Sequence, residues 1–342
     1  MWSYIADKYI KIVEIRMANN FPFPWRAIKF ARTPAVAVLM TSIFGLASVV
    51  QAIEVRNQEG DHQEGEHFKP TGKGWGHPDP TGLTAANAQK FSKVSTNGIF
   101  YHGGPVMLNS VNMYYIWYGA WDFSNDNTNT ILNSFGSYIG GTPYFNINTT
   151  YFDSNNAAVS GLVAASQSIA DAGSQGSALT DAAVENIVAK ALTNGMLPTD
   201  PNGVYFVLTS KEVTETSGFC TQYCAWHSHG TINGKDIKYG FVGNPLQCPS
   251  ACSAQTTTPN GNMGADAMAN LIAHELAESV TDPDLNAWFD RRGFENADKC
   301  AWKFGTTSTL SSGAKYNVSF GSMNWLLQQN WINAGGGYCT LK

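Results

Sequence analysis

Three ionisable side chains, His274, Glu275 and Glu278, form the pattern His-Glu-x-x-Glu inside an otherwise apolar stretch of the chain. Residues four apart lie on one face of a helix, so His274 and Glu278 can offer an imidazole nitrogen and a carboxylate oxygen to one metal ion. The pattern differs by one residue from the His-Glu-x-x-His of zinc hydrolases, where the intervening glutamate is the general base. It predicts zinc as cofactor, His274 and Glu278 as ligands, and Glu275 as the catalytic base of a peptidase-like hydrolase.

A zinc site of this kind needs a third protein ligand, and a second acidic segment supplies two candidates. Glu295 and Asp298 follow Glu278 closely enough for the chain to return to the helix. Asp298 is the first choice for the metal ligand and Glu295 the second. The carboxylate that does not bind the metal would then orient His274 from outside the ligand set.

The same residues also have a structural interpretation. His274 and Glu278 would then form a simple pair on a half-exposed helix, with Glu275 in water. However, residues 265–280 are apolar on nearly every side, which predicts a buried helix, and unpaired charges inside it would be costly. The alternative function is therefore a non-enzymatic extracellular protein. An aromatic content of 12% leaves glycan binding as a third and weaker hypothesis.

The elements that position this helix follow from local patterns. Runs of β-branched and aromatic residues predict strands at residues 111–118, 204–210 and 237–243. Apolar residues at helical spacing predict helices at residues 125–139, 156–171, 181–196 and 265–280, the last ended by Thr281, Asp282 and Pro283. Residues 284–342 are expected to hold turns, short strands and one short helix around 322–331. The fold class is α+β with a single mixed sheet, and a zincin-like arrangement is one form of it.

The cysteines favour disulfides and an oxidising compartment. There are six: Cys220, Cys224, Cys248, Cys252, Cys300 and Cys339. An even number in an exported chain predicts up to three disulfides, including one that ties the C-terminal part, with the connectivity open. The segment from Cys224 to His229 mixes cysteine and histidine. We interpret it as a disulfide-pinned loop, because structural zinc usually takes tighter cysteine pairs.

The N-terminal part predicts export. Residues 1–52 resemble a signal peptide, with Met17 as an alternative start, because basic residues precede an apolar run that ends in small residues. The run is borderline for a membrane span, so a retained anchor is the alternative. After cleavage we expect a secreted, extracellular protein without stable membrane insertion, in the apoplast or cell wall of a walled organism.

Composition separates a linker from the folded part and limits the partners. Residues 53–97 are rich in glycine, proline, histidine and charge and predict a flexible linker or propeptide, followed by a domain at residues 98–342. A net charge of −5 and the absence of a basic stripe after residue 52 argue against nucleic acid. The expected partner is an extracellular peptide or a cell-wall component.

Several short motifs, in order, resemble the EXORDIUM/phosphate-induced protein family over residues 98–342. They are Tyr101-His-Gly-Gly-Pro-Val106, Ile116-Trp-Tyr-Gly119, Val204-Tyr-Phe-Val-Leu-Thr209, Gly218-Phe-Cys220, Val242-Gly-Asn244 and Tyr338-Cys-Thr-Leu341. The resemblance implies a secreted or cell-wall protein associated in plants with growth control. Plant members of the family carry small residues where this chain has His274, Glu275 and Glu278. The resemblance therefore does not extend to the predicted metal site.

Overall fold

A five-stranded mixed sheet organises the protein, for which the computed structural model describes residues 70–73 and 98–342. The strand order is β3 (Val163–Asp171), β2 (Val111–Tyr118), β5 (Gly203–Thr209), β8 (Lys235–Val242) and β7 (Ala225–Ile232). The first four strands are parallel, and β7 runs antiparallel to β8 at the edge. Every residue of β5 is buried, because a central strand covered on both faces is apolar throughout.

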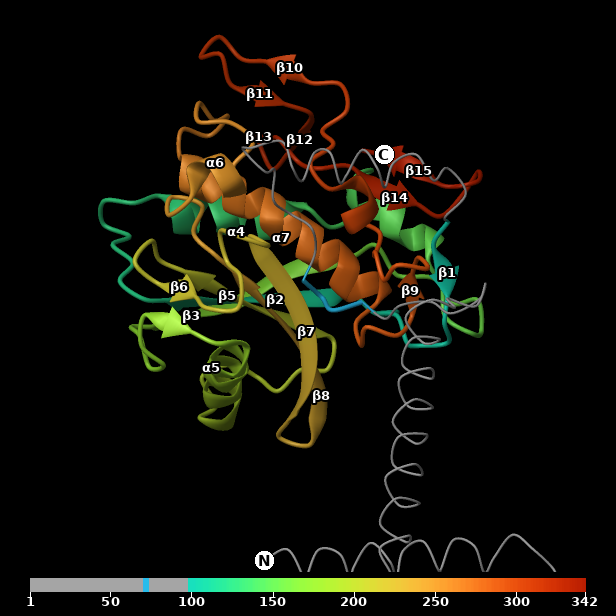
Figure 1. Cartoon of the computed structure of the whole chain (residues 1–342), viewed down its shortest axis with the longest axis horizontal. Helices are drawn as coiled ribbons and strands as arrows, with labels where there is room; N and C mark the ends of the chain where they lie inside the picture. The colour runs from blue at the N-terminus through green and yellow to red at the C-terminus, as the bar shows by residue number, and fades with distance from the viewer. Residues whose placement is uncertain (1–69, 74–97) are drawn as a thin grey trace, which may run out of the picture. The chain divides into compact units, whose positions relative to one another are not determined.

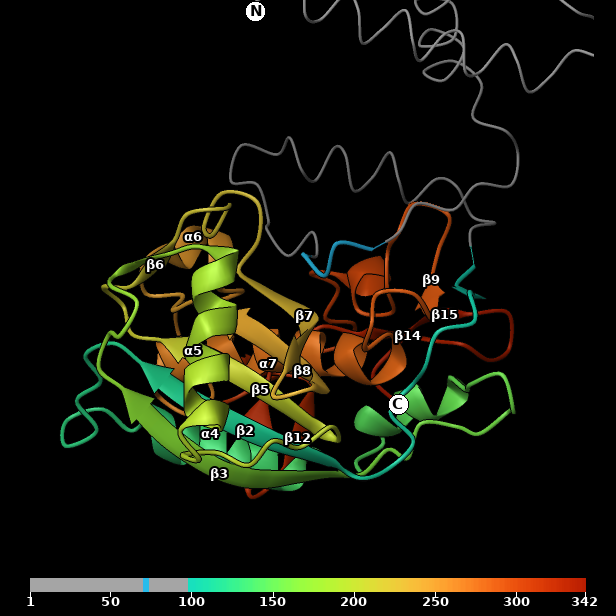
Figure 2. The same cartoon turned by 90° about the horizontal axis from the view of Figure 1, so that it is seen from below.

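Helices cover both faces of this sheet (Figures 1 and 2). The helix α7 (Met263–Thr281) packs against β7, β8 and β5, and α4 (Thr128–Tyr138) lies beside it on the same face. On the opposite face, α5 (Asp181–Thr193) contacts β5, β7 and β8. The α+β class with one main mixed sheet is therefore confirmed, and α7 is placed directly beside the antiparallel edge strand.

The remaining elements are short and surround this sandwich. They are β1 (Phe100–Tyr101), η1 (Phe145–Thr150), β4 (Ala178–Leu179), β6 (Thr214–Glu215), α6 (Pro249–Cys252), β9 (Trp288–Phe289), η2 (Asp298–Cys300), β10 (Ser308–Thr309), β11 (Lys315–Tyr316), β12 (Val318–Phe320), β13 (Met323–Trp325), β14 (Asn330–Ile332) and β15 (Tyr338–Thr340). Of these, η2 matters most for the site, because it carries one of the predicted ligands.

Three local predictions are wrong, each where pairing with a distant segment decides the structure. The helix predicted at residues 156–171 is instead β3, an edge strand that gains its hydrogen bonds from β2. The helix predicted around residues 322–331 is replaced by β13 and β14, which pair with β12 and β15. The loop predicted from Cys224 to His229 is the start of β7. The other predicted strands and helices are confirmed within a few residues at their ends.

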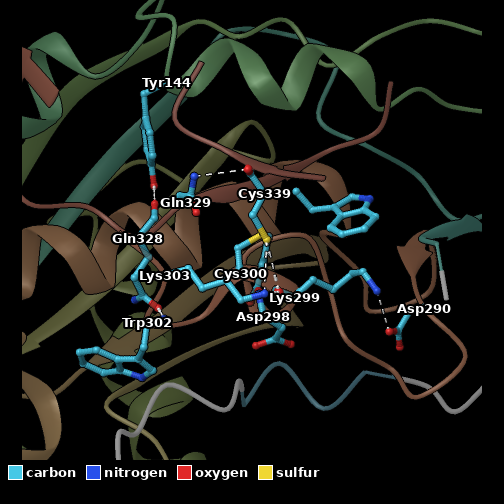
Figure 3. The surroundings of a disulfide bond; sticks show 12 residues. Tyr144, Asp290, Asp298, Lys299, Cys300, Trp302, Lys303, Gln328, Gln329 and Cys339 are labelled. Atoms are coloured by element: carbon cyan, nitrogen blue, oxygen red, sulfur yellow. Dashed lines mark hydrogen bonds and ion pairs between the residues drawn. A yellow bond between two sulfur atoms is a disulfide. The ribbon is translucent and has the colours of Figure 1, made fainter. Parts of the chain in front are cut away.

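All six cysteines form disulfides, as predicted. The pairs are Cys220–Cys248, Cys224–Cys252 and Cys300–Cys339. The first two tie the start of β7 to α6. The third ties η2 to β15, and Figure 3 shows Asp298 and Lys299 beside this bond. Residues 298–300 are therefore held from the C-terminal side by a covalent link.

The predicted signal peptide or anchor lies outside the described residues. Of the predicted linker or propeptide, only residues 70–73 are described. Among the described residues, no helix has the length and apolar character that crossing a membrane requires.

Candidate metal centre

The helix α7 positions the motif as a buried element. Its N-cap is Asn262, whose side-chain oxygen accepts a hydrogen bond from the Ala265 N–H at 3.0 Å. Every residue from Gly264 to Thr281 is buried, because the helix lies between the sheet and the C-terminal segments. The half-exposed pair and the water-facing Glu275 of the alternative interpretation therefore do not occur.

Asp298 meets the helix motif, so three of the predicted residues converge. The His274 Nε2 atom lies 3.1 Å from Glu278 Oε1 and 3.4 Å from Asp298 Oδ1. The backbone N–H of Asp298 donates to the same Glu278 oxygen at 2.9 Å and holds the two segments together. Ligands at about 2.0 Å from a tetrahedral zinc are about 3.3 Å from one another. The two measured separations are close to that edge length.

Unpaired polar atoms at this cluster provide a second test of whether a metal fits. Of the three atoms, His274 Nε2 and Asp298 Oδ1 are buried, and neither makes a hydrogen bond of acceptable geometry with the described residues. A buried polar atom without a partner is unfavourable, whereas a metal ion would satisfy a nitrogen and carboxylate oxygens together. The donor set of one imidazole and two carboxylates fits a divalent cation such as zinc.

Glu295 lies near the cluster but contacts a different histidine. Both of its carboxylate oxygens are 3.2 Å from His227 Nε2, and His227 Nε2 is also 3.7 Å from Glu278 Oε2. Thus Glu295 lies beside His227 on β7, whereas His274 has Glu278 and Asp298 as its acidic neighbours. Sequence reasoning missed His227 as a site residue, because it placed that segment in a loop. The signal would have been an inward-facing histidine in an alternating strand.

Glu275 is placed next to the predicted ligands on the His227 side. One ligand atom from each of His227, Glu275 and Glu278 lies within 4.8 Å of the others. The side chain of Glu275 is buried, and its Oε2 atom has no hydrogen-bond partner among the described residues. A carboxylate oxygen in this position can accept a proton from a group bound between the two segments.

Burial and crowding of negative charge shift the protonation of the cluster. Burial raises the pKa of Glu275 and of Glu295 well above the usual range, and neighbouring carboxylates add to this effect. Burial by itself would lower the pKa of His274, but Glu278, Asp298 and Glu275 outweigh it and raise the pKa. Burial lowers the pKa of His227 to about 4, so this ring is neutral at pH 7. A divalent cation would relieve the excess of carboxylates over imidazoles.

Asp282 ends α7 as the sequence predicts, and it introduces a pH-sensitive group. Its Oδ1 accepts from the backbone N–H groups of Asn286 and Ala287, both at 2.6 Å, while its Oδ2 is buried without a partner. Burial raises the pKa of Asp282 to about 7. The folded state therefore retains a proton that the unfolded chain releases between about pH 4 and 7, so stability falls as the pH rises through this window.

The variant Asp282→Asn tests this assignment in metal-free protein. Its free energy of unfolding relative to the wild type should increase between pH 4 and pH 8 by on the order of 4 kcal/mol, since the amide cannot ionise. Urea unfolding at several pH values measures the difference. Asp153→Asn is the control, because hydrogen bonds from the Ala157 and Asn155 amides lower the pKa of the partly exposed Asp153. A pH-independent difference for Asp282→Asn would contradict the assignment.

Comparison with known proteins gives one consistent result. A family model described as "Phosphate-induced protein 1 conserved region" matches residues 99–322, which contain every residue of the cluster. Protein EXORDIUM-like 3 of Arabidopsis thaliana is 30% identical over 277 residues, which cover 70% of this chain and 82% of that protein. Protein PHOSPHATE-INDUCED 1 of Nicotiana tabacum is 25% identical over 217 residues, covering 55% and 66% respectively. No solved structure matches the chain.

Proposed function

This chain belongs to the EXORDIUM/phosphate-induced protein family, and we propose that it is a secreted, zinc-dependent hydrolase of the peptidase type. The observation that carries the proposal is the triangle of His274, Glu278 and Asp298, in which the two edges from His274 Nε2 are close to those of a tetrahedral zinc site. The zincin-like form of the fold is part of the same proposal.

Each residue of the cluster would have its own role in such a site. Zinc, when bound, would polarise a carbonyl oxygen and acidify a water. His274 Nε2, Glu278 Oε1 and Asp298 Oδ1 would hold the ion, and the Asp298 N–H fixes the Glu278 carboxylate. Glu275 Oε2 would accept the proton, since it lies beside the ligands and has no hydrogen-bond partner among the described residues. On the other side of Glu278, His227 Nε2 lies 3.7 Å from Oε2 and is itself bound to Glu295.

The extracellular location in the proposal rests on the disulfides and on the family. Three disulfides suit an oxidising compartment, where small extracellular peptides or cell-wall components are the available partners. The sequence-predicted signal peptide would direct the chain there. Proteomic detection of a mature chain lacking residues 1–52 in the secreted fraction supports this location, whereas an intact leader in every fraction contradicts it.

One observation favours a second candidate, a non-enzymatic extracellular protein with a structural ion or a structural polar cluster. His274 and Glu275 expose only 4% and 2% of their surface. Catalytic zinc keeps an open position for water or substrate, whereas structural zinc is closed by protein. The two candidates differ in what they predict for Glu275, which is needed for hydrolysis but not for binding the ion.

The variant Glu275→Gln separates the two candidates. For a hydrolase, zinc content should stay the same while cleavage of unfolded casein falls at least about 100-fold, because the amide cannot accept the proton. Casein cleavage and zinc content are measured on the same preparations. Glu212 is exposed, accepts a hydrogen bond from the Ser210 hydroxyl and lies elsewhere, so Glu212→Gln is the matched control. A zinc-loaded wild type that cleaves no protein substrate contradicts the hydrolase and supports the structural ion.

The disulfide beside Asp298 should affect the metal as well as stability. Replacing Cys300 and Cys339 together by serine should lower the free energy of unfolding by about 4 kcal/mol, because a long loop is released in the unfolded chain. Since Asp298 is two residues from Cys300, zinc affinity should fall too, by about 10-fold or more.

The control for this prediction is the double variant of Cys220 and Cys248, which removes another disulfide away from Asp298. It should lose a similar amount of stability and retain its zinc affinity. Competition with a chromophoric chelator measures the affinity. An equal loss of affinity in both double variants would show that the effect comes from general loosening of the fold.

A further inference from the structure

Residues 70–73 lie along the open edge of the sheet. In the described structure β7 pairs with β8 on one side only, and on the other side the His227 N–H donates to the Gly72 carbonyl at 3.0 Å. The contact is tight, since a Cβ built on Gly72 would lie 2.0 Å from the His227 carbonyl oxygen. Gly72 also has a φ of +67°, which favours glycine. Figures 1 and 2 show this short blue segment next to β7.

The next residue, Lys73, places its ammonium group among side chains that suit a cation. Its Nζ lies 2.5 Å from Asp181 Oδ2 and 2.7 Å from Ser217 Oγ. The same nitrogen lies 5.2 Å from the ring centre of Tyr223 and 5.7 Å from that of Trp226, within the range of cation–π attraction. Three different parts of the fold, α5, the turn after β6 and the residues around the start of β7, thus contribute to one surface site for a basic residue.

One residue, His227, connects this edge of the sheet to the candidate metal centre. The backbone N–H of His227 holds Gly72, while the side chain of His227 contacts Glu295 at 3.2 Å and Glu278 at 3.7 Å. The same Cβ on Gly72 would lie 3.4 Å from the side chain of Leu285, which follows α7. A chain at the position of Gly72 therefore lies close to both β7 and the loop after α7, one side-chain length from the predicted ligands.

We propose that the outer edge of β7 and the side chains around Asp181 bind a peptide that bends at a glycine followed by a lysine or arginine. Residues 70–73 occupy this site as a tethered copy of such a peptide. Peptides commonly bind at an exposed sheet edge, where backbone hydrogen bonds give affinity and side-chain contacts give specificity, and here the bond from the His227 N–H to the Gly72 carbonyl is of this kind. The inference rests on the proposed function in one respect only: if the protein is a hydrolase, peptides of this kind are its substrate class. Binding itself needs no metal.

A tethered segment should compete with any peptide added in solution. A short connection to the same molecule acts as a millimolar concentration of competitor. Removing the Gly72 contact should therefore open the site to a free peptide, without any change in the site itself.

The test uses a fluorescein-labelled peptide with the sequence of residues 68–75, FKPTGKGW, and the full chain in a Glu275→Gln background, so that the probe stays uncleaved. Fluorescence anisotropy should show at least about 10-fold tighter binding to Gly72→Ala than to the parent chain. Gly195→Ala is the matched control, since Gly195 has a φ of +66° and open space around it. It should bind the probe like the parent.

Two further measurements keep the test independent of one variant's folding. Lys73→Glu should also open the site, and in either variant Asp181→Asn should weaken the probe about 10-fold by removing the partner of the basic residue. A probe with alanine at the Gly72 position should bind at least 10-fold more weakly, because of the clash with the His227 carbonyl.

Equal binding to the parent, Gly72→Ala and Lys73→Glu would overturn the inference, as would equal binding of the glycine and alanine probes. These results stand apart from the proposed hydrolase. The binding measurements hold whether or not zinc is present, so wild-type protein that carries no zinc but retains probe binding in the opened variants would overturn only the metal proposal.

Discussion

Elemental analysis of the purified protein should find about one zinc per chain, and the variant His274→Ala should contain almost none. His274 Nε2 is the one nitrogen of the triangle, and both Glu278 Oε1 and Asp298 Oδ1 lie close to it. Removing it leaves two carboxylates, which bind zinc weakly without a nitrogen ligand. Loss of one ligand typically lowers metal affinity by orders of magnitude. At micromolar zinc the wild type should therefore be fully loaded and His274→Ala should be empty.

The matched control is His229→Ala. His229 is a partly exposed histidine on the same strand as His227, and its Nδ1 pairs with Asp236 at 2.9 Å. Its removal should leave the zinc content unchanged. Asp298→Asn should show a graded loss, because the amide oxygen is a weaker ligand than a carboxylate. Wild-type protein purified with zinc but carrying none, or zinc retained in His274→Ala, would contradict the proposed centre.

The second large effect is the loss of stability on removing the metal. At a zinc concentration about 1,000 times the dissociation constant, binding stabilises the folded state by about 4 kcal/mol. For a domain of about 250 residues, this corresponds to a fall in Tm on the order of 10 °C after chelation. Calorimetry with and without EDTA measures it, and His274→Ala should show no response to EDTA.

The size of this effect should depend on pH with a definite sign. The raised pKa values of Glu275 and Glu295 mean that the metal-free folded state holds protons that the unfolded chain has released above about pH 4.5. Its stability therefore falls as the pH rises. The raised pKa of His274 acts in the same direction: its contribution is complete below about pH 6.5 and is lost as the pH rises through its folded pKa. Chelation should thus lower the Tm more at pH 8 than at pH 5, and the opposite order would contradict this arrangement.

Elements with strong local patterns could be predicted from the sequence. The dense β-branched and aromatic run Val111–Tyr118 forms β2, and the apolar stretch that ends before Pro283 forms α7. Their environments are almost wholly buried, so the local pattern and the tertiary packing favour the same structure. The local pattern did not predict the strand at the edge of the sheet. Val163–Asp171 is half exposed at the sheet edge, and its strand conformation depends on hydrogen bonds from β2, which no local pattern contains.

The sequence by itself determined the relation between His274 and Glu278, because their spacing on one helix fixes their separation whatever the surrounding fold. Only the tertiary structure decided that Asp298 joins them while Glu295 contacts His227, since both carboxylates lie on one short segment and their spacing along the chain does not say which of them reaches His274. The same holds for His227. It comes from a strand that precedes the helix, and its position depends on how β7 packs against α7, which is a property of the folded chain.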